Sequence, residues 1–282
     1  GRDLSDGESG KATSTVANRL AMAEQNCADP EAVQTGKAQA PLAAKVMIKP
    51  KDILPGAEGA PAAVPNAGSL VRAKDFVVLV KRPENADGET LVLLHGSGGD
   101  ETTLMSLAAR IAPRAVLMGV RGRIVQDGKK RWYRRLTPTS FDQDDIRHEA
   151  AAFAGFLQDA VEKGRLDPDH TTFIGYSNGA NLLAALTVLH PGLVERAVLL
   201  RPMSVLDEVP QAADLSQLRV LTVAGTADRI YAPLAPALEA VLRDHGASLD
   251  ARTIKANHGL GKQDVSIVAD WLDRANAISL NQ

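Results

Sequence analysis

A serine between two glycines has the setting that most directly suggests chemistry. Gly175, Ser177 and Gly179 form a G-x-S-x-G pattern. A β-forming run at 171–174 precedes it, and a helical pattern at 180–189 follows. Ser177 is therefore expected on a tight turn, where its hydroxyl projects beyond the end of the strand and the first N–H groups of the helix favour negative charge. The pattern indicates a nucleophile, although a strand-turn-helix without a catalytic role can also match it.

A serine hydroxyl needs a base to become a nucleophile, and the base needs an orienting carboxylate. His258 is the candidate base because it lies in a loop after the last predicted strand and before the last predicted helix. The other histidines lie in a glycine-rich loop, within a helix, in a turn and at two helix C-termini, which are positions typical of structural roles. They are His95, His148, His170, His190 and His245.

The acid should also follow the end of a strand. Asp228 does so in Gly225-Thr226-Ala227-Asp228, directly after the apolar run 220–224. As a structural alternative, Asp228 caps the helix that starts near Pro233. Asp207 follows the preceding strand and is the competing candidate for the acid.

Two backbone N–H groups are expected to form an oxyanion hole. One belongs to Asn178, directly after the nucleophile, and the other to the loop 95–99, whose small residues leave the backbone accessible. We favour Ser97 as the second donor, with Gly98 as the alternative. Taken alone, this loop also suggests phosphate binding, but it lacks the Gly-Lys-Ser/Thr ending of a P-loop.

Apolar runs and helical patterns alternate along most of the chain. This alternation predicts an α/β fold with a mostly parallel sheet covered by helices on both faces. Ligands of such sheets bind beyond the carboxyl ends of the strands, where the candidate residues lie. The predicted strands are 76–80, 91–94, 115–120, 171–174, 197–200, 220–224 and 249–254, and the predicted helices are 101–111, 144–162, 180–189, 234–243 and 264–275. The buried face predicted for helix 144–162 is Ile146, Ala150, Phe153, Phe156, Leu157 and Val161.

The composition is that of an ordinary soluble globular protein. The 282 residues are 45% hydrophobic and 23% charged, and the net charge of -2 gives no indication of nucleic-acid binding. No apolar run is long enough for a membrane span. The single cysteine, Cys27, cannot form an internal disulfide and belongs to no metal-ligand cluster. A cytoplasmic location is the default expectation, and secretion after removal of a signal peptide stays open.

The first 70 residues differ from the rest of the chain. They are rich in Ala, Gly and Pro, and the first aromatic residue is Phe76. We expect residues 1–70 to be an N-terminal extension that packs on the main domain or on a partner subunit of a homo-oligomer, and 71–282 to be the catalytic domain. Within the extension the pattern predicts an amphipathic helix at 14–27, a short strand at 45–48 and a linker at 55–68.

A basic stretch, 129–135, carries five cationic side chains in seven residues. Its Trp132 and Tyr133 could form a wall for an acyl group. Its arginines, with Arg121 and Arg123, could line the mouth of the cleft, where a guanidinium would bind a second acid group of the substrate. The alternative is a solvated loop with the aromatic rings packed beneath it and the arginines paired to nearby acids. Those acids would be Asp142, Asp144 or Asp145.

Residues from about 75 to 277 resemble the phospholipase/carboxylesterase group of α/β-hydrolases, which includes small esterases and acyl-thioesterases. The resemblance implies a triad of Ser177, Asp228 and His258, no large cap domain, and hydrolysis of carboxylic esters. Many members have a glycine where this chain has Asn257, and many lack a counterpart of residues 1–70. The matching pieces are 94–101, Arg131-Trp132-Tyr133-Arg134-Arg135, 141–145, Gly175-Tyr176-Ser177-Asn178-Gly179-Ala180-Asn181, Leu200-Arg201-Pro202-Met203 and 225–228.

These observations favour a serine carboxylesterase that hydrolyses short or medium esters through an acyl-enzyme, with no metal or organic cofactor. Gly98, Trp132, Tyr133 and Met203 are the expected substrate contacts. An acyl-thioesterase or lysophospholipase could use the same triad, and a ligand-binding protein could keep the fold without catalysis. A haloperoxidase-like or dienelactone-type hydrolase also shares the fold, but the latter usually has a cysteine where this chain has Ser177.

Overall fold

The structure is a computed structural model that describes residues 68–279. The predictions for the helix at 14–27, the strand at 45–48, Cys27 and nearly all of the linker at 55–68 concern residues outside this range. Of the predicted extension, the structure describes only 68–70. The catalytic domain predicted at 71–282 lies almost entirely within it.

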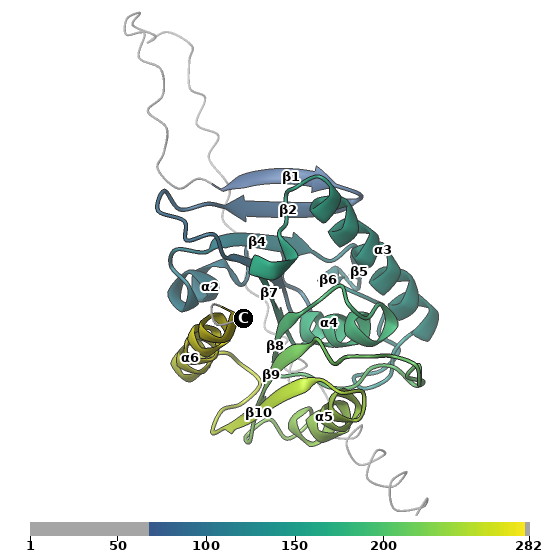
Figure 1. Ribbon diagram of the computed structural model, residues 1–282. Coiled ribbons are helices and arrows are strands. Elements are labelled where there is room, and N and C mark those ends of the chain that lie inside the picture. The colour runs from purple at the N-terminus through teal and green to yellow at the C-terminus, as the bar shows by residue number, and fades with distance from the viewer. Residues whose placement is uncertain (1–67, 280–282) are drawn as a thin grey trace, which may run out of the picture. The chain divides into compact units, whose positions relative to one another are not determined.

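Eight strands form one sheet in the order β1-β2-β4-β3-β7-β8-β9-β10 (Figure 1). The pairs β1–β2 and β2–β4 are antiparallel and all the others are parallel, which confirms the predicted mostly parallel sheet. The loops that follow the parallel strands therefore gather at one edge of the sheet. The strands are β1 (Ser69–Ala73), β2 (Phe76–Lys81), β3 (Thr90–Leu94), β4 (Val116–Arg121), β7 (Thr171–Tyr176), β8 (Arg196–Leu200), β9 (Arg219–Gly225) and β10 (Ser248–Ile254).

Helices cover both faces of the sheet, as predicted (Figure 1). Helices α3, α4 and α5 pack on one face and α2 and α6 on the other, so that the core has two layers. Successive side chains of a strand point to opposite faces of the sheet. Val92 and Leu94 of β3 pack in the layer under α3, α4 and α5, and Leu91 and Leu93 pack in the layer under α2 and α6. The helices are α2 (Met105–Ile111), α3 (Gln143–Glu162), α4 (Asn178–Leu189), α5 (Ala235–Asp244) and α6 (Lys262–Ser279).

Between residues 68 and 279 no helix has both the length and the apolar character needed to cross a bilayer. No large cap domain interrupts the described part of the chain either. The connections between the strands of the main sheet and the helices contain only four short elements. These are the strands β5 (Ile124–Gln126) and β6 (Lys129–Arg131) and the 3-10 turns Pro168–His170 and Ala232–Leu234.

Three strands were not predicted, β1 and the two strands of the hairpin β5–β6. Strand β1 starts at Ser69, two residues before the predicted domain boundary, and pairs with β2 at the edge of the sheet. Its side chains are mostly exposed, so the sequence has no apolar run to mark it. Strand β5 lies before the basic stretch 129–135, and β6, its hairpin partner, forms the first three residues of that stretch. Asp127 and Gly128 form its turn with φ of 52° and 70°, the left-handed pair that a tight hairpin needs.

Two helix predictions need correction. Helix α2 begins at Met105 instead of residue 101, because the Asp100 carboxylate accepts hydrogen bonds from Thr102 and holds residues 101–104 in a turn. In α3 the predicted buried face is confirmed except at Val161, which is 39% exposed. Ala160 is buried in its place, one residue earlier on the last turn of the helix.

The turn that carries Ser177 brings α4 unusually close to the sheet. A Cβ on Gly179 would lie 2.3 Å from the Leu94 carbonyl oxygen and 2.6 Å from that of His95. A Cβ on Gly175 would lie 2.6 Å from the Ala180 Cα. Since these neighbours are backbone atoms, neither glycine can gain a side chain unless the helix moves away from the strands.

Gly179→Ala should therefore lower the free energy of unfolding by about 1–3 kcal/mol, the usual cost of overpacking. Gly155→Ala is the matched control, because it also lies in a helix but its Cβ would meet nothing within 4 Å. That change should raise the free energy of unfolding by about 0.5–1 kcal/mol through helix propensity. Urea denaturation of both variants measures the difference, and equal effects would show that the close approach is not the reason for glycine at 179.

Candidate active site

Ser177 occupies the turn between β7 and α4 in a conformation that few residues adopt. Its φ of 50° and ψ of -114° fall in a region that costs a non-glycine residue on the order of 1–3 kcal/mol. Two backbone hydrogen bonds hold it there: its N–H donates to the Leu200 carbonyl at 2.8 Å, and its carbonyl accepts from Asn181 at 2.9 Å. The turn thus fixes the direction of the hydroxyl before any ligand arrives.

The structure brings the three residues of the predicted triad together. Ser177 Oγ lies 2.9 Å from His258 Nε2, and His258 Nδ1 lies 2.5 Å from Asp228 Oδ2. They come from three loops at the carboxyl edge of the sheet, after β7, β9 and β10. In this arrangement a proton on Nδ1 is donated to the carboxylate, which leaves Nε2 to accept the serine proton.

Asp228, and not Asp207, is the carboxylate beside His258. Asp228 is 7% exposed, and its second oxygen, Oδ1, accepts the N–H of Tyr231 at 3.1 Å. Asp228 is not the cap of the helix expected near Pro233, because neither the 3-10 turn Ala232–Leu234 nor α5 has a side-chain cap; its Oδ1 instead holds the turn that precedes them. Asp207 is exposed, and its N–H donates to the side chain of Gln143.

Arg201 clamps the loop that carries His258. Its guanidinium donates to the carbonyls of Asn257 and Gly259, the residues on either side of the histidine, at 2.9 Å each. Asp264 at the start of α6 neutralises it with two contacts of 2.8 and 3.1 Å, and both side chains are 0–1% exposed. Arg201 was assigned no role from the sequence. An arginine directly after the apolar run of β8 was the available signal, because a charge at the end of a buried strand needs a partner.

Asn257 replaces the glycine that many members of the resembled family have before the base. Its side-chain oxygen accepts the N–H of Gly259 at 2.9 Å, which closes a local turn around the histidine. Tyr176 also holds this loop, because its hydroxyl donates to the carbonyl of His258 at 3.1 Å. The departure from the family pattern therefore leaves His258 held in place.

Two backbone N–H groups near Ser177 are free to donate to a ligand oxygen. Within residues 68–279, neither the N–H of Ser97 nor that of Asn178 donates a backbone or side-chain hydrogen bond. Gly98, the alternative to Ser97, is ruled out, because its N–H donates to the Lys130 carbonyl at 2.8 Å. The prediction is corrected on this point: Gly98 holds the loop to strand β6.

His95 shapes the loop that carries Ser97, as expected. Its Nε2 accepts the N–H of Gly122 at 3.0 Å, so Nδ1 carries the proton and donates to the Gly96 carbonyl at 2.7 Å. Burial lowers the pKa of His95, which keeps the ring neutral in this tautomer. The ring is 1% exposed and makes no contact with Ser177 among those described.

Trp132 is a core residue and not a wall for an acyl group. Its ring is fully buried and packs against Phe76 and Phe153, with centroids 6.4 and 5.4 Å away. Its indole N–H donates to the His95 carbonyl, and its backbone N–H donates to the side chain of Asn178. Trp132 therefore connects the two loops that carry the N–H groups of the predicted oxyanion hole.

A narrow cavity of about 30 Å³ opens beside Ser177. Tyr133 and Met203 line it, as predicted for substrate contacts, whereas Gly98 and Trp132 do not. The backbone N–H of Met203 donates to the side chain of Asn181, which fixes the methionine at the cavity wall. The lining also includes Ser97, Asn178, Arg131 and Arg135.

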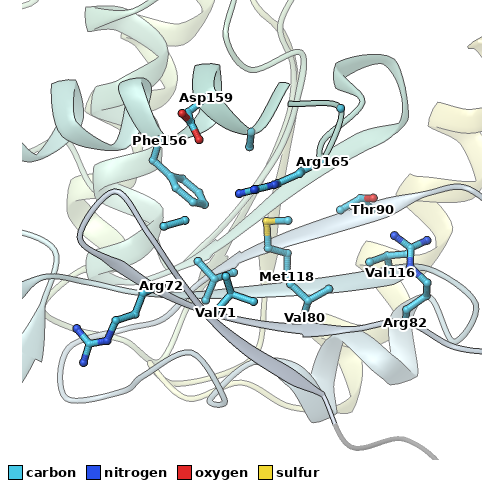
Figure 2. Close-up of a pocket in the computed structure, with 14 residues that line it drawn as sticks. Val71, Arg72, Val80, Arg82, Thr90, Val116, Met118, Phe156, Asp159 and Arg165 are labelled. Atoms are coloured by element: carbon cyan, nitrogen blue, oxygen red, sulfur yellow. The ribbon is translucent and has the colours of Figure 1, made fainter. Parts of the chain in front are cut away.

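A much larger cavity, about 620 Å³, lies elsewhere (Figure 2). Phe156 and Arg165 stand on one side of it and Val71, Val80 and Met118 on the other. Thr90, at the amino end of β3, also lines it, so this cavity is at the opposite end of the strands from Ser177. No residue of the predicted site contributes to it.

Arg121 and Arg123 do not line the mouth of the cleft. Arg121 forms a forked ion pair with Glu101, and Arg123 forms one with Glu149 at 2.8 and 2.9 Å. The predicted pairing with Asp142, Asp144 or Asp145 is wrong. Asp142 caps helix α3, and Asp145 accepts the backbone N–H of Arg134.

No group of three or more His, Cys, Asp and Glu side chains in the described part of the chain is placed to hold a metal ion. The candidate site consists of a serine, an imidazole, a carboxylate and backbone N–H groups. This set is suited to acyl transfer, in which a proton moves along hydrogen bonds and charge develops on one oxygen.

Comparison with known proteins points to one class of protein, the hydrolases. No protein-family model matches the chain. MhqD of Bacillus subtilis (strain 168), whose assignment as a hydrolase is provisional, is 32% identical over 190 residues, which are 66% of this chain and 92% of that protein. The crystal structure of a carboxylesterase from Mesorhizobium loti is 50% identical, with a TM-score of 0.70 over 73% of this chain and 98% of that one.

Two more solved structures are similar. A Bacillus cereus carboxylesterase is 29% identical, with a TM-score of 0.66 over 71% of this chain and 94% of its own. YahD, solved with malic acid, is 26% identical, with a TM-score of 0.63 over 71% and 98%. The chain belongs to the α/β-hydrolases of the phospholipase/carboxylesterase type, and is thus a hydrolase with the fold predicted from its sequence.

The Arg201–Asp264 pair generates a prediction about the His258 loop. Asp264→Asn leaves the buried guanidinium uncompensated and should lower the free energy of unfolding by about 3 kcal/mol. It should also shift the NMR resonances of the His258 ring, because both flanking carbonyls lose a firmly held donor. Asp250→Asn, which breaks the solvent-accessible pairs with Arg252 and Arg274, is the matched control and should change neither quantity measurably. Unchanged His258 resonances in Asp264→Asn would contradict the clamp.

Proposed function

We propose that this chain is a serine carboxylesterase that hydrolyses short or medium carboxylic esters through an acyl-enzyme on Ser177. The observation that carries the proposal is the continuous chain of contacts Ser177 Oγ–His258 Nε2 and His258 Nδ1–Asp228, beside two free N–H groups. The Mesorhizobium loti and Bacillus cereus relatives are described as carboxylesterases, which supports the same class of substrate.

In the first half of the reaction Ser177 Oγ attacks the ester carbonyl carbon while His258 Nε2 takes the hydroxyl proton. The imidazolium that forms is stabilised by Asp228 through Nδ1–H. The carbonyl oxygen becomes negative and is held by the N–H groups of Ser97 and Asn178, the latter at the positive end of α4. When this intermediate collapses, His258 returns the proton to the leaving alkoxide.

In the second half a water molecule attacks the acyl-enzyme. His258 removes its proton, the same N–H groups stabilise the second oxyanion, and the acid leaves as Ser177 recovers its proton. Every proton transfer uses residues of this chain, and the scheme requires no metal or organic cofactor.

The narrow cavity supports short acyl groups over long ones. The cavity is small and largely polar, since Ser97, Arg131 and Asn178 line it, so it offers a long lysophospholipid chain little apolar surface. Thioesters of short acids would fit the same steps, and matched oxygen and sulfur esters would separate the two activities. All residues of the proposed mechanism lie between Ser97 and His258, inside the proposed catalytic domain, whose sheet already begins at Ser69.

The role of Ser177 is tested by hydrolysis of p-nitrophenyl esters of graded chain length. Ser177→Ala should lose nearly all turnover and keep its fold, because the half-buried hydroxyl contributes little to stability. Ser204→Ala is the matched control, a serine after the neighbouring strand β8 that makes no contact with His258 among those described. If Ser177→Ala retains the kcat of the unchanged protein, another residue is the nucleophile.

The role of Asp228 is tested against Asp207. Asp228→Asn should reduce kcat by about 10⁴, the effect that loss of the orienting carboxylate has in a serine triad. Asp207→Asn should leave kcat nearly unchanged, because Asp207 is exposed and contacts Gln143. A large loss in Asp207→Asn together with a small one in Asp228→Asn would transfer the role to Asp207.

A further inference from the structure

We propose that the cavity beside Ser177 contains a carboxylate-binding site formed by Arg131 and Arg135, and that the ester substrate carries a carboxylate next to its reacting carbonyl. This inference rests on the proposed esterase function and names its substrate class. The carboxylate can belong to the acyl part, as in a half-ester of a dicarboxylic acid, or to the alcohol part, as in an ester of a hydroxy acid.

Arg131 is a buried guanidinium without a carboxylate partner. The residue is 3% exposed and lines the cavity. The one hydrogen bond described for its side chain runs from Nη1 to the Ser97 hydroxyl at 2.8 Å. Its Nε is buried and has no partner. A buried donor left unpaired costs stability, so its retention at a cavity wall points to an acceptor that arrives with the ligand.

Other arginines of the described chain show how a structural guanidinium is paired in this fold. Arg121, Arg123 and Arg201 each form a forked pair with a carboxylate, and Arg196 pairs with Glu89 at 2.9 Å. Arg131 has only a neutral hydroxyl in the corresponding place. This contrast separates Arg131 from the arginines that hold the fold together.

Arg135 places a second positive charge at the same cavity. It is half-buried, and its side chain forms no hydrogen bond or ion pair within residues 68–279. Burial first, and then the nearby Arg135, lower the pKa of Arg131. Asp127 acts on Arg131 only from beyond ion-pair distance. Since a guanidinium stays charged at neutral pH, an entering carboxylate would relieve both the desolvation and the repulsion.

Tyr133 supplies a third buried polar group on this wall. Its hydroxyl makes no hydrogen bond of good geometry, although the side chains of Asn178 and Asn181 lie close to it, and burial raises its pKa, so it stays protonated. Buried side-chain polar atoms without a partner are few in the described chain. They are Arg131 Nε, Tyr133 Oη and Thr172 Oγ1, and the first two belong to residues of this cavity.

The contact between Arg131 and Ser97 places the proposed carboxylate site next to the reacting carbonyl of the substrate. Ser97 accepts from Arg131 through its hydroxyl and, in the proposed mechanism, donates to the oxyanion through its backbone. The carboxylate and the reacting carbonyl are therefore bound by neighbouring groups, as a small substrate carrying both requires. A planar guanidinium matches the two oxygens of a carboxylate.

The test compares esters that differ only in charge, with hydrolysis followed by titration at constant pH. For the acyl arm the pair is monomethyl succinate and methyl butanoate. For the alcohol arm it is O-acetylglycolate and ethyl acetate. The unchanged full chain should give a higher kcat/KM for the charged ester in one arm, and that arm identifies the part that carries the carboxylate.

Arg131→Gln should lower the charged-to-neutral ratio of kcat/KM by about 10- to 100-fold, the usual effect of one charge-assisted hydrogen bond. Arg135→Gln should lower it by a smaller factor, because that side chain is more exposed to solvent. Arg134→Gln is the matched control: it is a neighbouring, exposed arginine that does not line the cavity, and it should leave the ratio unchanged. The ratio is the readout because both esters of a pair use the same nucleophile.

A preference for the neutral ester in both arms would overturn the proposal, as would a ratio that survives Arg131→Gln. If Arg131→Gln does not fold, the ratio of the unchanged protein and its loss in Arg135→Gln decide. If no ester is hydrolysed, the esterase function fails, and calorimetric binding of succinate still tests the site. Binding to the full chain that is lost in Arg135→Gln and kept in Arg134→Gln would support the site, and absence of binding would overturn it.

Discussion

The close approach of helix α4 to the sheet is the constraint on which the candidate site depends. The backbone at Gly179 lies so near the Leu94 and His95 carbonyls that no side chain fits between them. This contact sets the helix start, so that Ser177 sits at the tip of the turn and Asn178 directs a free N–H to the same side. It also draws in the loop after β3, which carries Ser97. A looser packing would separate Ser177, the proposed nucleophile, from the groups proposed to stabilise the oxyanion.

The second requirement is that loops from distant parts of the sequence keep a fixed relation at the carboxyl edge of the sheet. Arg201 fixes the loop of the proposed base, since one guanidinium binds the carbonyls on both sides of His258 and the carboxylate at the start of α6. Trp132 does the same for the proposed oxyanion side by joining the His95 and Asn178 regions. Both residues are buried and neither contacts the serine hydroxyl, so their contribution is one of position.

The sequence predicted the architecture and the meeting of Ser177, His258 and Asp228 well, for a physical reason. Strands buried on both faces read as apolar runs, and in a parallel sheet the residues that follow such runs converge. The prediction failed where structure depends on contacts distant in sequence. Strand β1 has an exposed, mixed pattern, and the ion pairs of Arg121 and Arg123 join residues more than a dozen positions apart. Trp132 was expected at the substrate, with a place beneath the loop as the alternative, and it lies in the core. Nothing local distinguishes an aromatic residue above a loop from one beneath it.

The most direct measurement of the central claim is the structure of a covalent phosphonate adduct. A fluorophosphonate reacts with an activated serine and leaves a tetrahedral phosphoryl group that mimics the reaction intermediate. We expect the phosphorus on Ser177 Oγ and the phosphoryl oxygen within hydrogen-bond distance of the N–H groups of Ser97 and Asn178. An adduct on any other residue, or a phosphoryl oxygen that contacts neither N–H group, would contradict the account.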